Sequence, residues 1–187
     1  MSRGDSLSRP SLANMETLEL IRPTPLLADA YLDMCRELIA DDTRLSGILP
    51  STLDELLPSF QRWQEQERIG DETTGGVPQT TYWLVRNGRE ILGSGKLRHC
   101  LTPSQEKTVG HVDYGIRPSA RRKGYGTRLL TLMLAEARLM RMRDVLVMCR
   151  KTNTGSVRVI ERNGGLLLGE FARCSDGEPM LRYTIKL

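Results

Sequence analysis

One stretch near the middle of the chain constrains the fold most, because it joins an expected strand to an expected helix through a basic turn that contains glycine. Residues 109–116 include the valine, tyrosine and isoleucine side chains that are typical of a strand. From Leu130 to Met140, apolar residues recur at i, i+3, i+4 and i+7, which predicts an amphipathic helix. The stretch therefore predicts a strand, a tight turn and the start of a helix.

The start of this helix is an expected anion-binding site. The first turn of any helix leaves backbone N–H groups without partners and carries the positive end of the helix dipole. Gly124 and Gly126 have no Cβ, so a phosphate could approach the main chain of residues 122–127 closely. Arg121, Arg122 and Lys123 add positive charge, and the turn therefore predicts a site for a pyrophosphate.

Two common phosphate-binding motifs do not fit this turn. A dinucleotide-binding Rossmann site needs Gly-x-Gly-x-x-Gly, whereas Gly124-x-Gly126 is followed by Thr127-Arg128-Leu129. A P-loop ends in Gly-Lys-Ser/Thr, whereas Lys123 here precedes the glycine. A solvated basic turn without a ligand remains the alternative interpretation.

The turn and a second motif together resemble the GNAT acetyltransferases. Arg121-x-x-Gly124-x-Gly126 is similar to the Arg/Gln-x-x-Gly-x-Gly/Ala signature of that superfamily. Downstream, a strand-like run at 145–149 is followed by Asn153-x-x-Ser156, which resembles the second motif of the family. The resemblance covers residues 80–187 and implies an α/β fold with a mixed, largely antiparallel central sheet and helices on both faces.

The chain also resembles an uncharacterised bacterial branch of the same superfamily. This resemblance rests on the pattern Leu97-Arg98-His99 followed by Gly110-His111-x-x-Tyr114. This branch suggests no particular acceptor.

The resemblance implies an acetyl-CoA-dependent N-acetyltransferase, in which a primary amine attacks the thioester directly. Coenzyme A would be held by three groups of residues. The main chain of the strand is expected to bind the pantetheine amides and the acetyl carbonyl, through Tyr114, Gly115 and Ile116. The loop is expected to bind the pyrophosphate through Arg121, Arg122, Lys123, Gly124, Tyr125, Gly126 and Thr127. Asn153 and Ser156 are expected to face the cofactor from the other side.

The candidates for the general base are His111, Asp113 and His99. Strand alternation puts His111 and Asp113 on one face, and histidine has an unperturbed pKa suited to proton transfer. Each candidate has the alternative of being an ordinary sheet residue. Many family members carry an acid tyrosine four residues after the Ala/Ser position, but this chain has Ile160 there. An acyl-CoA-binding sensor or a protein-interaction module on the same fold is therefore the alternative function.

The rest of the chain is expected to form one domain over residues 15–187, after a disordered lead at 1–14. Two early helices are predicted: one from the apolar stripe between Leu26 and Ile39, and one that is capped by Ser51 and broken or kinked at Pro58. The family resemblance puts both over the acceptor side, where Phe60 and Trp63 are either substrate contacts or core residues. The expected strands are 18–21, a hairpin of 80–85 and 90–101 around an Asn87-Gly88 turn, 107–117, 144–149, 165–170 and 180–186.

Composition excludes several classes of protein. The four cysteines among 187 residues form no Cys-x-x-Cys, and two histidines give no zinc-ligand spacing, so we expect no metal and a reducing cytoplasm. The net charge of +4 is spread among 23 acidic residues, and aromatics make up only 5%, so no nucleic-acid partner is expected. No apolar run reaches transmembrane length, which predicts no membrane partner. The expected partner is a small-molecule or peptide amine, and pairing of the final strands into a homodimer is common among relatives.

Overall fold

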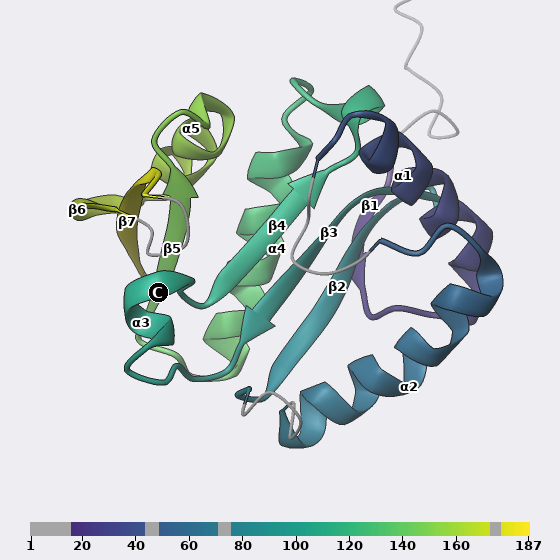
Figure 1. Ribbon diagram of the computed structural model, residues 1–187, viewed down its shortest axis with the longest axis horizontal. Coiled ribbons are helices and arrows are strands. Elements are labelled where there is room, and N and C mark those ends of the chain that lie inside the picture. The colour runs from purple at the N-terminus through teal and green to yellow at the C-terminus, as the bar shows by residue number, and fades with distance from the viewer. Residues whose placement is uncertain (1–15, 44–48, 71–75, 173–176) are drawn as a thin grey trace, which may run out of the picture.

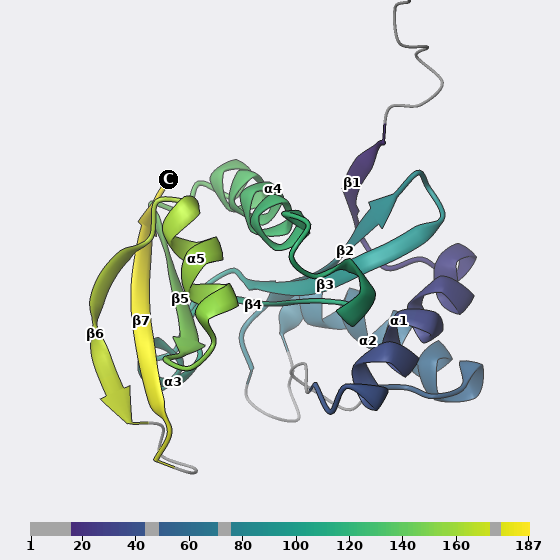
Figure 2. The same cartoon turned by 90° about the horizontal axis from the view of Figure 1, so that it is seen from above.

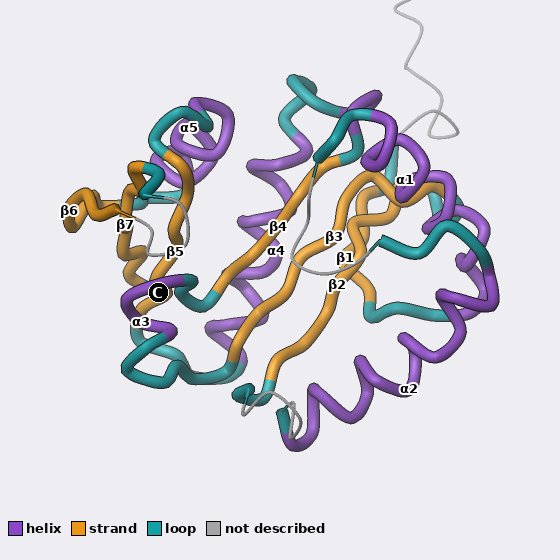
Figure 3. The backbone as a smooth tube through the Cα atoms, in the orientation of Figure 1, coloured by secondary structure: helices purple, strands orange, loops and turns teal. Residues whose placement is uncertain are grey.

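The protein is built on one seven-stranded mixed sheet in the order β1-β2-β3-β4-β5-β7-β6 (Figures 1 and 3). The computed structural model describes residues 16–43, 49–70, 76–172 and 177–187, so the expected lead at 1–14 lies outside the described residues. The strands are β1 (Leu18–Ile21), β2 (Gln79–Arg86), β3 (Glu90–Arg98), β4 (Val112–Ile116), β5 (Asp144–Arg150), β6 (Leu166–Ala172) and β7 (Pro179–Lys186).

The sheet consists of two antiparallel parts that meet at a single parallel junction. β1 to β4 form an antiparallel meander, and β5, β7 and β6 form a second antiparallel group. β4 and β5 run parallel, and their register contains only the pair Val112 and Val147. The predicted mixed, largely antiparallel sheet is confirmed.

Helices cover both faces of this sheet. The helices are α1 (Ala28–Ala40), α2 (Leu53–Ile69), α3 (Gln105–Thr108), α4 (Tyr125–Leu139) and α5 (Thr154–Arg162), with short 3₁₀ turns η2 (Pro25–Leu27) and η3 (Pro118–Ala120). Figure 2 shows α4 on one side of β3 and β4 and the pair α1 and α2 on the other, while α5 lies beside β5. Within the described ranges, no helix is both long and apolar enough to span a membrane.

Each helical layer has its own hydrophobic core. On the α4 side, Leu129, Leu130 and Met133 are fully buried against the sheet. On the α1 and α2 side, the core is an aromatic cluster in which Tyr31 stacks on Trp83 with ring centroids 4.5 Å apart. Phe60 and Trp63 contact Trp83 edge-on; Phe60 is a buried residue of this core, and Trp63 is partly buried and packs against it.

The structure corrects four local predictions. Thr52, not Ser51, caps α2 by accepting from the Glu55 N–H, while Ser51 binds the Glu55 carboxylate. α2 runs through Pro58 to Ile69, so of the two expectations for this proline, a break or a kink, the break is wrong.

The other two corrections concern the ends of elements. Leu26 and Ile39 do not belong to the buried stripe of the first helix, because Leu26 lies in η2 before α1 and both side chains are exposed. The strand expected at 107–117 begins only at Val112, because residues 105–108 form the helical turn α3.

Candidate active site

The anion loop, residues 117–127, connects the end of β4 to the start of α4. After the η3 turn the backbone takes two left-handed conformations, at Arg122 with φ +61° and at Gly124 with φ +85°. Gly124 is the N-cap of α4, and no side chain caps the helix there. Alternation of ordinary and left-handed residues turns successive N–H groups toward one side of a loop, which suits an anion.

The main-chain N–H groups of the loop are free to bind such an anion. Among the described residues, no N–H from Arg122 to Thr127 finds a protein acceptor, and the first helical bond runs from Arg128 N–H to Gly124 C=O at 3.1 Å. These donors lie at the positive end of the α4 dipole. The predicted anion site therefore has the free donors that it requires.

A second row of free main-chain groups lies along the edge of β4. Arg98 N–H donates to His111 C=O at 2.8 Å and Arg117 N–H donates to Leu92 C=O at 2.9 Å. This ladder turns alternate residues of β4, including Gly115, toward β3, and it turns Tyr114 and Ile116 toward β5. β5 is not paired with β4 at that level, so the Tyr114 N–H and C=O and the Ile116 N–H face the gap between the two strands.

Asn153 and Ser156 lie at the start of α5, which follows β5. The Asn153 Oδ1 atom accepts from the Ser156 N–H at 3.0 Å, so Asn153 is the cap of this helix. The Tyr114 hydroxyl is buried and has no hydrogen-bond partner of good geometry among the described residues. Burial raises the pKa of Tyr114 to about 12, and the nearby Ser156 hydroxyl acts in the opposite direction.

Two basic side chains of the loop, Arg121 and the exposed Lys123, donate hydrogen bonds to protein acceptors. Arg121 donates to Ile116 C=O at 3.1 Å, to Asp41 at 2.7 Å and to Thr43 at 2.9 Å. Lys123 Nζ donates to Ser119 C=O at 2.9 Å.

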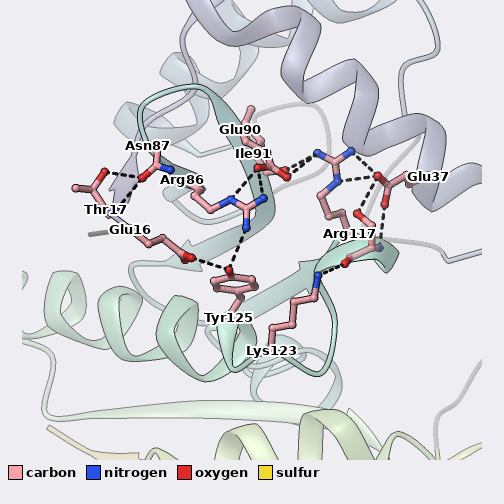
Figure 4. Close-up of polar contacts among 11 residues, drawn as sticks. Glu16, Thr17, Glu37, Arg86, Asn87, Glu90, Ile91, Arg117, Lys123 and Tyr125 are labelled. Carbon is pink, nitrogen blue, oxygen red and sulfur yellow. Dashed lines mark hydrogen bonds and ion pairs between the residues drawn. The ribbon is translucent and has the colours of Figure 1, made fainter. Parts of the chain in front are cut away.

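Tyr125 is buried, and its hydroxyl lies between two charged residues (Figure 4). It donates to Glu16 at 3.1 Å and accepts from Arg86 at 3.2 Å. Among the predicted loop residues, Arg121, Lys123 and Tyr125 therefore have side chains engaged by protein, whereas Arg122 is exposed.

Gly126 has a packing role. A Cβ at this position would lie 3.2 Å from Cγ2 of Val159, so glycine permits the close approach of α4 and α5. Its N–H is one of the free donors, as is that of Thr127.

The three candidate bases do not lie together. His111 Nδ1 accepts from Leu146 N–H at 3.0 Å, which ties β4 to β5 and leaves the proton of the neutral ring on Nε2. Burial lowers the pKa of His111, which favours this neutral form. His111 thus has its one basic nitrogen already engaged.

His99 is further from the gap. It lies just past β3, four residues beyond Gly95, which pairs with Tyr114, so about 13 Å separates the two levels of the sheet. Its Nε2 atom is 2.8 Å from Thr80 Oγ1, and burial lowers the pKa of His99.

Asp113 is the candidate that lies next to the free edge of β4. Its Oδ2 atom accepts from Arg98 Nη2 at 2.7 Å, and its side chain is 36% exposed. Arg98 is itself held by Gly110 C=O at 3.1 Å. The carboxylate is therefore fixed in position while its other oxygen has no hydrogen bond to a described residue.

Two further features of the site concern a general acid and a metal ion. Ile160, at the position of the family's acid tyrosine, is fully buried in the core. No group of three or more His, Cys, Asp or Glu residues in the described ranges is arranged to hold a metal ion.

Sequence reasoning missed Glu37 and Asp41 on α1, which bind the anion loop across 80 or more residues of sequence. Acidic residues on the polar side of a helix are usually solvated, so no local signal distinguishes these two.

Solved structures that are similar to this fold include proteins described as acetyltransferases. RimL, a ribosomal L7/L12 α-N-protein acetyltransferase solved with coenzyme A, is similar with a TM-score of 0.69 and 18% identity over 91% of this chain and 94% of that one. RimJ from Mycobacterium smegmatis, solved with CoA-disulfide, has a TM-score of 0.69 and 14% identity over 90% of this chain and 81% of that one. The acetyltransferase yncA from Salmonella typhimurium, solved with its cofactor acetyl-CoA, has a TM-score of 0.61 and 13% identity over 91% of this chain and 94% of that one.

The sequence itself assigns the family. The model of the acetyltransferase (GNAT) domain matches residues 18–165, and the chain belongs to this family. Comparison with curated protein sequences gives no match.

Proposed function

We propose that the protein transfers the acetyl group of acetyl-CoA to a primary amine, by direct attack of the amine on the thioester. The observation that carries this proposal is the run of free N–H donors from Arg122 to Thr127, at the end of the β4 edge that is open toward β5. The similarity to proteins solved with coenzyme A or acetyl-CoA supports it.

The cofactor fits the two rows of free main-chain groups. The pyrophosphate would accept hydrogen bonds from the loop N–H groups, with charge added by Arg122. The pantetheine arm would run along the β4 edge, bound by Tyr114 and Ile116. Asn153 and Ser156 would border the pantetheine arm from the α5 side. The main chain of Gly115 faces β3, and this residue would leave room beside the thioester.

Catalysis in this arrangement would depend mostly on positioning. A bound thioester held against N–H donors needs only an amine placed within attack distance and an acceptor for its proton. We assign the proton acceptor to Asp113, because it is the neighbour of Tyr114 in β4 and its Oδ1 atom has no hydrogen bond to a residue in the described ranges. The buried Ile160 leaves protonation of the sulfur to another group or to water.

Ile160 also favours a second candidate function, a protein that binds acyl-CoA without turnover. Release of free thiol from acetyl-CoA, measured with a panel of amines that includes peptide N-termini and small amines, separates the two. We expect thiol release that depends on the amine and falls 100-fold or more in Asp113→Asn, on the order of a general base's contribution. Asp29→Asn, an exposed carboxylate of α1, should leave the rate unchanged. Cofactor binding without thiol release for any amine would support the sensor instead.

We further propose a cytoplasmic protein that forms a homodimer. Cys35, Cys100 and Cys149 are free thiols, which suits a reducing compartment. β6 is an edge strand whose Leu166, Leu167 and Leu168 are exposed, and such an edge favours pairing with a second copy. Sedimentation of the wild type and of Leu167→Lys tests the dimer, and a wild-type monomer at micromolar concentration would contradict it.

A further inference from the structure

We propose that two acidic residues of α1, Glu37 and Asp41, act as a clamp that holds the anion loop in its binding conformation. Arg117 and Arg121 are then positioning residues of the cofactor site rather than phosphate ligands. This inference rests on the proposed function, since the loop is taken to bind coenzyme A.

Glu37 holds the first half of the loop (Figure 4). Its carboxylate accepts from Arg117 Nε at 2.9 Å and also from Arg117 Nη2, and it accepts from both the N–H and the hydroxyl of Ser119 at 3.0 Å each. The Arg117 side chain is 12% exposed and donates in addition to Ile91 C=O at 3.2 Å. The end of β4 and the η3 turn are thus fixed to α1 by one carboxylate.

The charge of Glu37 is maintained by these contacts. Burial would by itself raise the pKa of Glu37, but the hydrogen bonds from Arg117 and Ser119 outweigh burial and hold the pKa below its usual range. The clamp is therefore ionised at neutral pH.

Asp41 holds the next part of the loop. It is the C-cap of α1, and it accepts from Arg121 Nη1 at 2.7 Å, while Thr43 accepts from Arg121 Nη2 at 2.9 Å. The Arg121 Nε atom donates to Ile116 C=O at 3.1 Å. Each of the three guanidinium nitrogens of Arg121 is thus bound to protein, and its N–H donates to Pro118 C=O at 3.2 Å.

The loop needs such support because its own conformation is costly. Arg122 has a positive φ, which is strained for a residue with a Cβ, and the N–H donors of residues 122–127 lie in one short loop without acceptors among the described residues. On the far side of these donors, Tyr125 is held by Glu16 and Arg86. The donors therefore lie between two anchors, which reduces the entropy that cofactor binding must remove.

The clamp and simple electrostatics predict opposite changes in coenzyme A affinity when the charge of Asp41 is removed. If Arg121 were a phosphate ligand in competition with Asp41, removal of the Asp41 charge would free the arginine and strengthen coenzyme A binding. If Asp41 is a clamp, its removal weakens binding although a negative charge near a phosphate site is lost. The two accounts therefore differ in direction, not only in size.

The test is calorimetric titration of coenzyme A into the wild type, Glu37→Gln, Asp41→Asn, Arg121→Gln and the double variant Asp41→Asn/Arg121→Gln. We expect affinity to fall about tenfold in Glu37→Gln and about threefold in Asp41→Asn, with the double variant no weaker than Arg121→Gln alone. Asp33→Asn is the matched control, because Asp33 lies on the same helix, is exposed and, within the described ranges, pairs with Arg36 alone, at 2.5 Å. It should leave the affinity unchanged.

The outcomes distinguish failure of the clamp from failure of the proposed function. Wild-type protein that binds no coenzyme A overturns both. Wild-type binding with equal or tighter binding in Asp41→Asn overturns the clamp alone, as does a double variant whose loss is the product of the single losses. Thermal unfolding of each variant establishes that it is folded, and the exposed Asp41 keeps the test decisive if Glu37→Gln does not fold.

Discussion

At residue 122 the chain keeps an arginine in a backbone conformation that ordinarily favours glycine. Its φ of +61° places Cβ close to the following carbonyl oxygen, which costs about 1–2 kcal/mol. The Arg122 side chain is exposed, so its charge is available where we propose that a pyrophosphate binds. Sequence alone identified the basic residues around this turn. It did not show which of their side chains are exposed, because the exposure of each side chain depends on partners such as Asp41 and Glu16 that are distant in sequence.

Arg122→Gly should therefore change stability and binding in opposite directions. We expect the free energy of unfolding to rise by about 0.5–1 kcal/mol through relief of the left-handed strain, and coenzyme A affinity to fall severalfold through loss of a charge. Urea denaturation and calorimetric titration measure the two effects. Arg141→Gly is the control, because Arg141 has φ +60° just after α4 ends, away from the loop. It should be stabilised without a change in affinity, and a stabilised Arg122→Gly that binds as tightly as the wild type would contradict the role of this charge.

Among the elements, β4 and β5 show what a sequence can and cannot specify. Alternation and turn signals identified both strands, and their parallel order followed from the helix that connects them. The early end of their pairing was not predictable, because only the fold shows that Val112 and Val147 form a single registered pair and that the His111 ring accepts from the Leu146 N–H beside it. A sheet histidine in the sequence does not reveal whether its nitrogen is a base or a tether.

The tether predicts how stability depends on pH. The pKa of His111 is lowered by burial, with Arg98 acting in the same direction and Asp144 and Glu106 opposing it, so the folded protein takes up this proton only at lower pH than the unfolded chain does. Below the unfolded value of 6.5 the unfolded state binds more protons, and stability should fall as pH falls, by up to about 1.4 kcal/mol per pH unit, until the folded pKa is reached.

His99 contributes to the same slope, because burial lowers its pKa too and the chain has only two histidines. His111→Asn keeps an acceptor for the Leu146 N–H but does not titrate, so it should reduce the slope of stability against pH below 6.5. The double variant with His99→Gln should remove the histidine contribution. Urea denaturation from pH 7 to 5 measures these slopes, and an unchanged slope in His111→Asn would show that the ring is not held neutral.

At the scale of the whole molecule, the proposed cofactor site lies where the two helical layers meet the part of the sheet in which β4 and β5 are not paired. The α4 layer supplies the helix start, and the α1 and α2 layer supplies the clamp from the opposite face. The local motif predicted the helix start at α4 and the mixed sheet. The clamp could not be predicted, because contacts such as Glu37 to Ser119 join residues that only the completed fold brings together.

The measurement that tests the account most directly is coenzyme A binding by the wild type, Gly124→Val and Gly88→Val. Gly124 and Gly88 have φ of +85° and +65°, and a Cβ at either position would meet no atom within 4 Å, so a side chain introduces similar backbone strain in both. Only at Gly124 does the new side chain lie among the free N–H donors. We predict that Gly88→Val binds as the wild type does and that Gly124→Val binds at least about 100-fold more weakly, since a phosphate can no longer reach the main chain. Equal binding by the two folded variants would contradict the assignment of the anion loop as the cofactor site.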